Sequence, residues 1–147
     1  MHASSIILGF LAAASTALAA PAADIEARAA APAWTITDYR RSCDTKDKSC
    51  RVYFGIDTHV AGSGVTLCYF TLQGEPASQA SVNGITCGPY TVSSAWSGQF
   101  GPNNGFTTLA VVNVVKKQIV WPAYTDKEVG KDNVPVTPNK SYVPASL

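Results

Sequence analysis

The feature that most constrains the fold of this chain is a series of short apolar runs separated by Gly, Pro and Asn residues. From Ala29 onward, 30 of the 119 residues are Val, Thr or Ile, which strands favour. Apolar residues recur with a period of two in most of these runs, and helical periods are almost absent. The sequence therefore predicts an all-β protein, with helix confined to one short turn over residues 77–81.

The runs place the predicted strands at 34–39, 52–56, 65–72, 82–87, 90–96, 107–115 and 118–121. The run 65–72 is apolar on both faces, which predicts a strand in the middle of a sheet or between two layers. Gly101-Pro-Asn-Asn-Gly105 is the strongest turn signal, and three prolines after Tyr124 leave room only for short edge segments. Seven or eight short strands with this spacing predict a compact antiparallel β-sandwich or partly open β-barrel.

The first 28 residues have the composition of processing segments. Residues 6–18 form an apolar stretch that is too short to span a bilayer, and Ala17-Leu18-Ala19 fits the small-x-small cleavage pattern. This predicts a signal peptide over 1–19, followed by a propeptide over 20–28 that ends at Arg28. The remaining residues, 29–147, are expected to form one secreted, extracellular domain. No second long apolar segment follows, so no transmembrane anchor is predicted.

Four cysteines lie in the predicted secreted domain: Cys43, Cys50, Cys68 and Cys87. Secretion into an oxidising compartment favours two disulfides. The cysteines are separated by six, seventeen and eighteen residues, which is not the paired spacing of zinc ligands. Three pairings are possible in principle. Cys43 and Cys50 flank a polar loop between two strand-like runs and can face each other across a hairpin, which leaves Cys68 to pair with Cys87.

The charges and catalytic residue types argue for a protein that acts by binding. The chain has 11 Lys and Arg against 10 Asp and Glu, so it lacks the basic excess that follows a nucleic-acid backbone. His59 is the only histidine after residue 28, and no nucleophile, metalloprotease or phosphate-binding motif occurs. A loop position exposed to solvent is therefore the simpler interpretation of His59. No catalytic residue and no cofactor are predicted.

Two alternatives involve acidic residues. Asp38, Asp57, Asp126 and Glu128 are the candidates for a pair of glycosidase carboxylates, although the sequence gives neither their separation nor a substrate groove. Asp44 and Asp47 are interleaved with lysines, which oppose a bound calcium ion. The sequence therefore predicts no metal site, and a hydrolase remains the least favoured of the functions considered.

Large aromatic side chains beside turns are the candidate partner contacts. They are Trp96, Phe100, Trp121 and Tyr124. Such residues anchor protein interfaces when they are exposed, but they also fill β-sheet cores, and both interpretations stay open for each tryptophan. Phe100, within Gly98-Gln-Phe-Gly-Pro, is expected to be the most exposed of the four. Asn139-Lys-Ser is a glycosylation sequon that secretion makes usable.

Five segments of the sequence together resemble one protein family. They are Trp34-Thr-Ile-Thr-Asp-Tyr, Cys87-Gly-Pro-Tyr-Thr-Val, Trp96-Ser-Gly-Gln-Phe-Gly, Gly105-Phe-Thr-Thr-Leu and Lys116-Lys-Gln-Ile-Val-Trp-Pro-Ala-Tyr-Thr-Asp-Lys. In this order they resemble the fungal secreted proteins related to the Alternaria major allergen. They are most similar to the members of that family that induce the hypersensitive response, the elicitors from plant-pathogenic fungi. The resemblance covers nearly all of the predicted secreted domain.

The resemblance implies a compact antiparallel β-barrel that plants perceive as an elicitor of cell death and defence. It implies a plant protein as partner, either a thaumatin-like pathogenesis-related protein or a cell-surface receptor, with a small flavonoid-like ligand as the alternative. The central disulfide of the family corresponds to Cys68 with Cys87, in agreement with the pairing above. The cysteine that links the allergen dimer has no counterpart in residues 29–34, so we expect a monomer.

Overall fold

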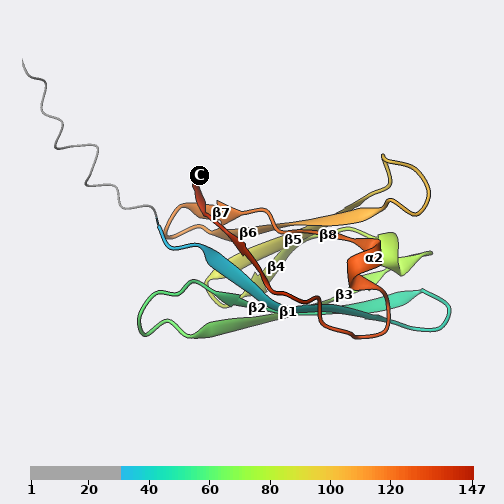
Figure 1. The fold of residues 1–147 in the computed structure, drawn as a ribbon, viewed down its shortest axis with the longest axis horizontal. Coiled ribbons are helices and arrows are strands. Elements are labelled where there is room, and N and C mark those ends of the chain that lie inside the picture. Colours follow the sequence, from blue (N-terminus) through green and yellow to red (C-terminus); the bar gives the residue numbers. More distant parts are fainter. Residues whose placement is uncertain (1–30) are drawn as a thin grey trace, which may run out of the picture.

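The computed structural model describes residues 31–147, and these form two antiparallel β-sheets packed face to face (Figure 1). The predicted signal peptide (1–19) and propeptide (20–28) lie outside the described residues. The first sheet has the strand order β3-β2-β1-β9, formed by Val65–Gln73, Ser49–Asp57, Trp34–Cys43 and Lys140–Tyr142. The all-β prediction is confirmed, and the arrangement is that of a sandwich.

The second sheet has the strand order β10-β7-β6-β5-β4. Its strands are Ala145–Ser146, Gln118–Val120, Phe106–Asn113, Tyr90–Ser97 and Val82–Cys87. A further short strand, β8 (Ala123–Thr125), also pairs with β6, so β7 and β8 run along the same neighbour with Trp121 and Pro122 between them. The predicted strands agree with these bounds to within a few residues, except that β1 and β2 extend further towards their hairpin.

Alternating side chains from both sheets fill the space between the layers. Along β6, for example, Leu109 and Val111 are fully buried while Ala110 and Val112 face outward, as the period of two predicts. Aromatic contacts join the two sheets: Trp34 meets Tyr90 edge to face, with ring centroids 5.4 Å apart. Burial of such large side chains is the main source of stability in a sandwich.

The position of β3 corrects one prediction. The run 65–72 was expected in the middle of a sheet or between layers, but β3 is the edge strand of the first sheet. Its inward residues Cys68, Phe70 and Leu72 are buried, whereas Val65 and Tyr69 face solvent. The prediction was wrong because it assumed that an apolar outer face must be covered, and no described residue forms a layer over this one.

Both disulfides pair as predicted. Cys43 and Cys50 face each other across the β1–β2 hairpin, with their Cα atoms 4.0 Å apart. Cys68 and Cys87 join β3 to β4, so this bond links the edges of the two sheets. Chain-entropy arithmetic for these loops gives about 2.5 and about 3.3 kcal/mol of stabilisation. No cysteine among the described residues is free.

Helix is limited to two short pieces. The 3-10 helix η1 (Ala77–Gln79) falls where the sequence predicts a helical turn. The one-turn helix α2 (Asp126–Val129) was not predicted. Thr125 caps it, because its hydroxyl accepts a hydrogen bond from the Glu128 amide while the Glu128 carboxylate accepts one from the Thr125 amide. Neither described helix has the length and apolar character needed to span a membrane.

Candidate functional site

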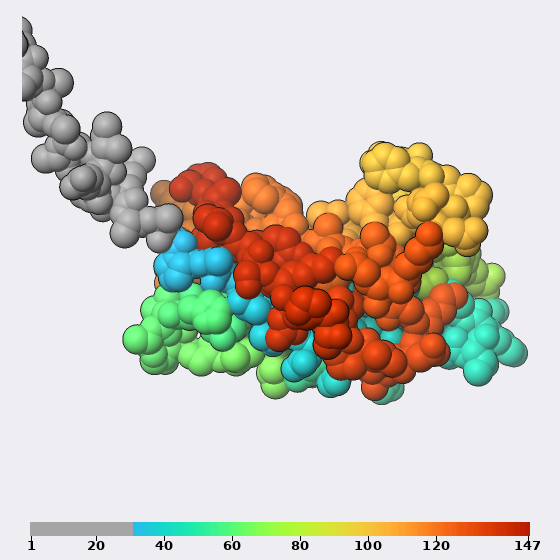
Figure 2. All heavy atoms as spheres, viewed as in Figure 1, coloured from blue at the N-terminus to red at the C-terminus, as the bar shows by residue number. Residues whose placement is uncertain are grey.

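The structure places Phe100 where the sequence predicts, on an exposed turn between β5 and β6. Its side chain is 66% exposed and stacks on Phe106, with ring centroids 5.6 Å apart. The backbone of the turn is held by hydrogen bonds from the Gly101 amide to the Gly98 carbonyl and from the Asn104 side chain to the Phe100 carbonyl. Phe100 is therefore an exposed aromatic residue in a fixed position, and Figure 2 shows this turn (yellow) standing out from the surface.

A groove of about 540 Å³ lies beside this turn, and we call it the Phe100 groove. Its lining comes from the turn, from the start of β6, from β8 with α2, and from β9: Phe100, Asn103, Asn104, Phe106, Ala123, Tyr124, Thr125, Lys127, Glu128 and Lys140. The volume is within the range of small-ligand sites.

A lysine and a glutamate form a charged pair on the rim of the groove. The Lys140 ammonium lies 2.7 Å from the Glu128 carboxylate and 4.6 Å from the centre of the Tyr124 ring. Partial burial alone raises the pKa of Glu128, but the hydrogen bonds from Lys140 and Thr125 outweigh it and hold this pKa below its usual value. The groove thus combines aromatic walls with a fixed ion pair.

Tyr124 contributes to this site from the core. Its side chain is only 2% exposed, and its ring stacks on Tyr39 with the centroids 4.0 Å apart. Of the two interpretations given above, the structure therefore favours the core for Tyr124. One edge of the residue still lines the groove beneath Lys140.

Trp96 is half-buried and tightly held. Its indole N–H donates a hydrogen bond of 2.8 Å to the Asp126 carboxylate. A Cβ atom on Gly105 would lie 2.8 Å from the indole ring, and one on Gly98 would lie 2.5 Å from it, so both positions need glycine. Trp96 is thus held by structural contacts, and it also lines a second hollow beside the turn.

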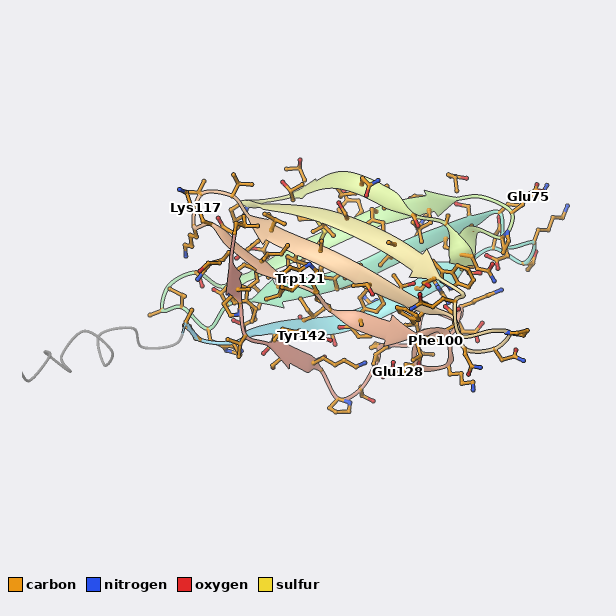
Figure 3. The ribbon with its side chains drawn as sticks, turned by 90° about the horizontal axis from the view of Figure 1, so that it is seen from above. Glu75, Phe100, Lys117, Trp121, Glu128 and Tyr142 are labelled. Carbon is orange, nitrogen blue, oxygen red and sulfur yellow. A yellow bond between two sulfur atoms is a disulfide. The ribbon has the colours of Figure 1, made fainter. Side chains whose placement is uncertain are left out.

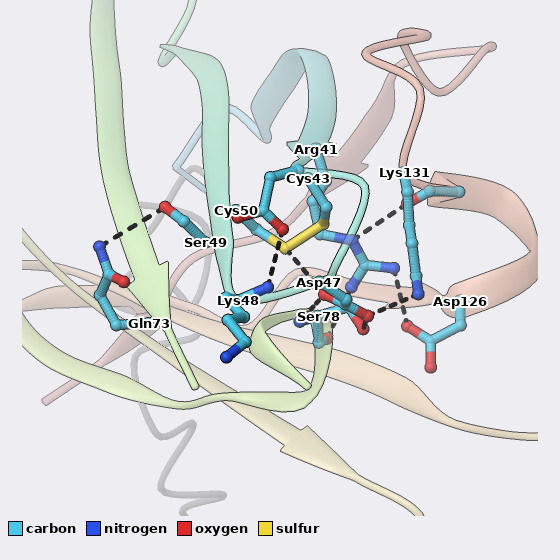
Figure 4. The surroundings of a disulfide bond; sticks show 12 residues. Arg41, Cys43, Asp47, Lys48, Ser49, Cys50, Gln73, Ser78, Asp126 and Lys131 are labelled. Carbon is cyan, nitrogen blue, oxygen red and sulfur yellow. Dashed lines mark hydrogen bonds and ion pairs between the residues drawn. A yellow bond between two sulfur atoms is a disulfide. The ribbon is translucent and has the colours of Figure 1, made fainter. Parts of the chain in front are cut away.

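Asp126 connects Trp96 to a larger set of hydrogen bonds. Figure 4 shows the part of this set around Arg41 and Asp47. We call this set the polar network, and it consists of Arg41, Asp47, Ser78, Trp96, Asp126 and Lys131. The Arg41 guanidinium is buried and donates to the Asp126 carboxylate at 3.1 Å, to the Ser78 carbonyl at 2.9 Å and to the Gly130 carbonyl at 3.0 Å. A buried charge is tolerated only when it is paired in this way.

Asp47 forms the other end of the polar network. Its carboxylate accepts hydrogen bonds from the amide and hydroxyl of Ser78 and from the Lys131 ammonium. Burial alone raises the pKa of Asp47, but these donors outweigh it and hold the pKa below its usual value. The network therefore ties the β1–β2 hairpin to η1 and to the segment after α2. The Lys131 ammonium already neutralises the Asp47 carboxylate, so this carboxylate is not available to a metal cation.

Trp121 is exposed but lies apart from the groove. It is 53% exposed and stands between β7 and β8, where Pro122 interrupts the strand and accepts a hydrogen bond from the Leu109 amide. Figure 3 shows Trp121 over the middle of the second sheet, whereas Phe100 and Glu128 lie together towards one end. The structure thus brings together Phe100 and Tyr124, with Trp96 behind the same turn, and leaves Trp121 outside.

His59 occupies the exposed loop position that the sequence predicts, but it has hydrogen-bonded partners. Its Nε2 atom lies 2.7 Å from the Thr35 hydroxyl, which lies 2.8 Å from the Ser141 hydroxyl, and its Nδ1 atom lies 3.5 Å from the Asp57 carboxylate. This order of groups resembles that of a hydrolase triad. The site is open to solvent, and its contacts join the loop after β2 to β1 and β9.

The other acidic candidates have structural partners. Asp126 belongs to the polar network and Glu128 pairs with Lys140. Asp38 sits at an irregularity of β1 with a φ of 53°, and its amide donates to the Asn139 side chain at 3.0 Å. The Asp44 carboxylate accepts from the Lys48 amide. Asn139 itself is exposed in the loop before β9, as a glycosylation site must be.

One group of potential metal ligands occurs among residues 31–147, and it consists of Cys43, Asp47 and Cys50. Both cysteine sulfurs are joined in a disulfide and the aspartate carboxylate is bound by Lys131 and Ser78. The group therefore offers no thiolate to a metal.

Comparison with known proteins places these features in a family. The family model described as "Effector TSP1" matches residues 35–147. A protein of Hypocrea virens (strain Gv29-8 / FGSC 10586) named "Effector TSP1" is 52% identical over 149 residues, which cover all of this chain and 99% of that protein. The chain belongs to the Effector TSP1 family.

The range that matches the Effector TSP1 family contains the Phe100 groove and the polar network in full. Phe106 and Lys140 are among the groove residues that sequence reasoning missed. The alternation of β6 carries a signal for Phe106, because an inward Leu109 places Phe106 on the outer face. Lys140 carries no such signal, because its position depends on the pairing of β9 with β1, more than a hundred residues away.

Proposed function

We propose that this member of the Effector TSP1 family is a secreted fungal effector that plants perceive as an elicitor of hypersensitive cell death and defence. It acts as a monomer by binding a plant protein, either a thaumatin-like pathogenesis-related protein or a cell-surface receptor, and it performs no chemical step. Family membership supports the role of effector. The resemblance to the Alternaria allergen family supports the response, together with the sandwich fold and the Cys68–Cys87 disulfide.

The observation that carries the binding proposal is the exposed Phe100 beside its groove. An aromatic side chain that is 66% exposed, yet held by Phe106 and by the hydrogen bonds of its turn, loses little conformational entropy when a partner covers it. Aromatic residues of this kind dominate the binding energy of protein interfaces. Phe100 is the anchor of the proposed contact, and the groove accepts a side chain of the partner.

Leaf infiltration with the purified secreted protein tests the response. Cell death should persist with His59→Ala and Asp57→Ala, because recognition by binding needs no proton transfer from either side chain. It should be lost after reduction and alkylation, because the two disulfides together contribute about 4–6 kcal/mol, which is comparable to the stability of a small domain. A folded His59 variant that is inactive would contradict a mechanism based on recognition alone, and a heat-denatured sample that keeps full activity would point to a linear peptide.

Phe100→Ala tests the contact itself. Binding to the plant partner should weaken by about 1–2 kcal/mol while circular dichroism stays unchanged. The matched control is Val115→Ala, which truncates a residue that is 89% exposed in the turn between β6 and β7. Equal binding by both variants would show that Phe100 is not part of the interface.

Mass spectrometry of the secreted protein tests the predicted cleavage after Arg28 and the use of Asn139 for a glycan.

The dimensions of the Phe100 groove favour one second candidate, the binding of a small flavonoid-like aromatic ligand. A volume of about 540 Å³ with aromatic walls suits such a molecule. A fluorescence titration with a flavonoid tests this candidate, and the wild-type signal should saturate. Phe106→Ala should abolish this signal, whereas Trp121→Ala, outside the groove, should leave it in place. Unsaturable quenching would contradict a defined site.

A further inference from the structure

The outer face of the first sheet carries a row of exposed side chains along β3. Tyr69 is 78% exposed, Leu67 is 59% exposed and Val65 is 49% exposed. Each is the outward residue of an edge strand, and no described element covers them. The largest continuous apolar patch on the surface of a monomeric protein is often a contact site.

Basic and aromatic residues of the neighbouring strands extend this row. Tyr53 of β2 stands opposite Tyr69 of β3 and opposite Arg40 of β1 in the strand register. The Arg40 guanidinium lies over the Tyr53 ring, 4.4 Å from its centre, and Arg51 stands two residues before Tyr53 on the same strand. We call Arg40, Arg51, Tyr53 and Tyr69 the arginine-tyrosine face. A hollow of about 500 Å³ is lined by all four of them.

The two arginines of this face have no acidic partner among the described residues. Arg41, Lys48, Lys131 and Lys140 each form an ion pair, whereas Arg40 and Arg51 form none. Acidic residues occur nearby, since Asp38 precedes Arg40 by two positions and Asp132 forms a β-bridge with Ser42. Neither aspartate pairs with a guanidinium in the described part of the chain. The face therefore presents two positive charges that no described carboxylate neutralises, beside two aromatic rings.

We propose that the arginine-tyrosine face binds an acidic, extended segment of a partner protein. Arg40 and Arg51 lie on adjacent strands two register positions apart, so their Cα atoms are about 8 Å apart by sheet geometry. Alternate side chains of an extended segment are about 7 Å apart. Two carboxylates at alternate positions fit the two guanidinium groups, each accepting a pair of hydrogen bonds, and an apolar neighbour of the segment packs on Tyr69.

The chemistry of the face favours a protein segment over a polyanionic chain. Tyrosine and arginine are the residue types most often found as energetic centres of protein interfaces. Two arginines neutralise only two charges, and a net charge of +1 for the whole chain gives little attraction for a long polyanion. This face is separate from the Phe100 groove, with which it shares no lining residue, so the proposal stands whether or not Phe100 contacts the plant partner.

Titration of the ¹⁵N-labelled secreted protein with a short synthetic peptide that alternates Glu and Leu tests the proposal. Amide resonances of β1, β2 and β3 should shift, and the matched peptide with Gln in place of Glu should bind at least tenfold more weakly. Arg40→Gln and Arg51→Gln should each weaken binding of the Glu peptide at least fivefold. Lys46→Gln, in the exposed hairpin loop, is the matched control and should leave binding unchanged.

Tyr69→Ser provides a variant that does not alter charge, and it should also weaken binding at least fivefold in a protein with unchanged circular dichroism. Equal affinity for the Glu and Gln peptides would overturn the proposal, as would shifts confined to the second sheet. Tighter binding of an acidic oligosaccharide such as oligogalacturonate, with the same dependence on Arg40 and Arg51, would overturn the choice of a protein partner in favour of an anionic glycan.

Discussion

The polar network and the Phe100 groove meet in the four residues of α2 but differ in how their side chains are used. Asp126 points to Arg41 and Trp96, whereas Glu128, two residues later, forms the rim of the groove with Lys140. In the network each polar group has a partner within the protein. In the groove the Phe100 ring faces solvent, whereas Tyr124 lines it from the core. The contrast suggests that the network keeps the turn in place and that the groove is left free to make contacts.

Asp126→Ala should have the largest effect, because it removes the only ion-pair partner that Arg41 has among the described residues. A buried charge left without its partner typically costs about 3–5 kcal/mol. Chemical denaturation of the purified variant measures this loss. Asp132→Ala is the control, because Asp132 is exposed and forms no ion pair with a described residue, and its unfolding free energy should change by less than about 0.5 kcal/mol.

Trp96→Ala should come next, at about 2–3 kcal/mol, because the side chain is half-buried and leaves a cavity between Gly98 and Gly105. Trp96→Phe separates the two contributions of the indole, since it keeps most of the ring and loses the hydrogen bond to Asp126. It should cost about 1–2 kcal/mol in the same denaturation experiment. If the Trp96→Ala variant kept its unfolding free energy, Trp96 would not be a structural member of the polar network.

Asp47→Asn should cost about 1.5–3 kcal/mol at pH 7, because it weakens charge-assisted hydrogen bonds from Ser78 and Lys131. The folded pKa of Asp47 lies below the ordinary value of 3.8, so this contribution is fully present above about pH 5 and is lost as the pH falls below 3.8. The difference between wild type and variant should therefore shrink at pH 3. A difference that stays constant between pH 7 and pH 3 would contradict an ionised Asp47.

Phe100→Ala should have the smallest effect on folding, below about 0.5–1 kcal/mol, because an exposed ring gains little from its single stacking partner Phe106. Thermal unfolding of the purified variant measures this change in stability. Together with the loss of partner binding proposed above, this result would make the contrast sharp: network variants change stability first, and groove variants change binding at constant stability.

Local patterns made most of the fold predictable. The period of two identified β4, β5 and β6 almost to the residue, and the polar loop between Cys43 and Cys50 identified the hairpin and hence both disulfides. The site was less predictable. The hydrogen bond between Arg41 and Asp126 joins residues that are 85 positions apart, and no pattern in the sequence predicts such a contact.

The error at β3 has a different cause. An exposed apolar strand has the same sequence pattern as a strand covered on both sides, because the pattern records the side chains and not the layer that meets them. Only the strand order, with β3 at the edge, distinguishes the two cases. Tyr69, which this prediction placed in the interior, now forms part of a proposed binding surface.

The pairing of β9 with β1 has a consequence for how the protein is made. Trp34 stands opposite Tyr142, so the first sheet is complete only when β9, near the end of the chain, pairs with β1. A chain that emerges from the ribosome in order cannot bury this strand edge as it grows, and closing such a long loop is slow. During synthesis the incomplete sheet therefore presents an open strand edge, which is a site for aggregation until β9 has been made.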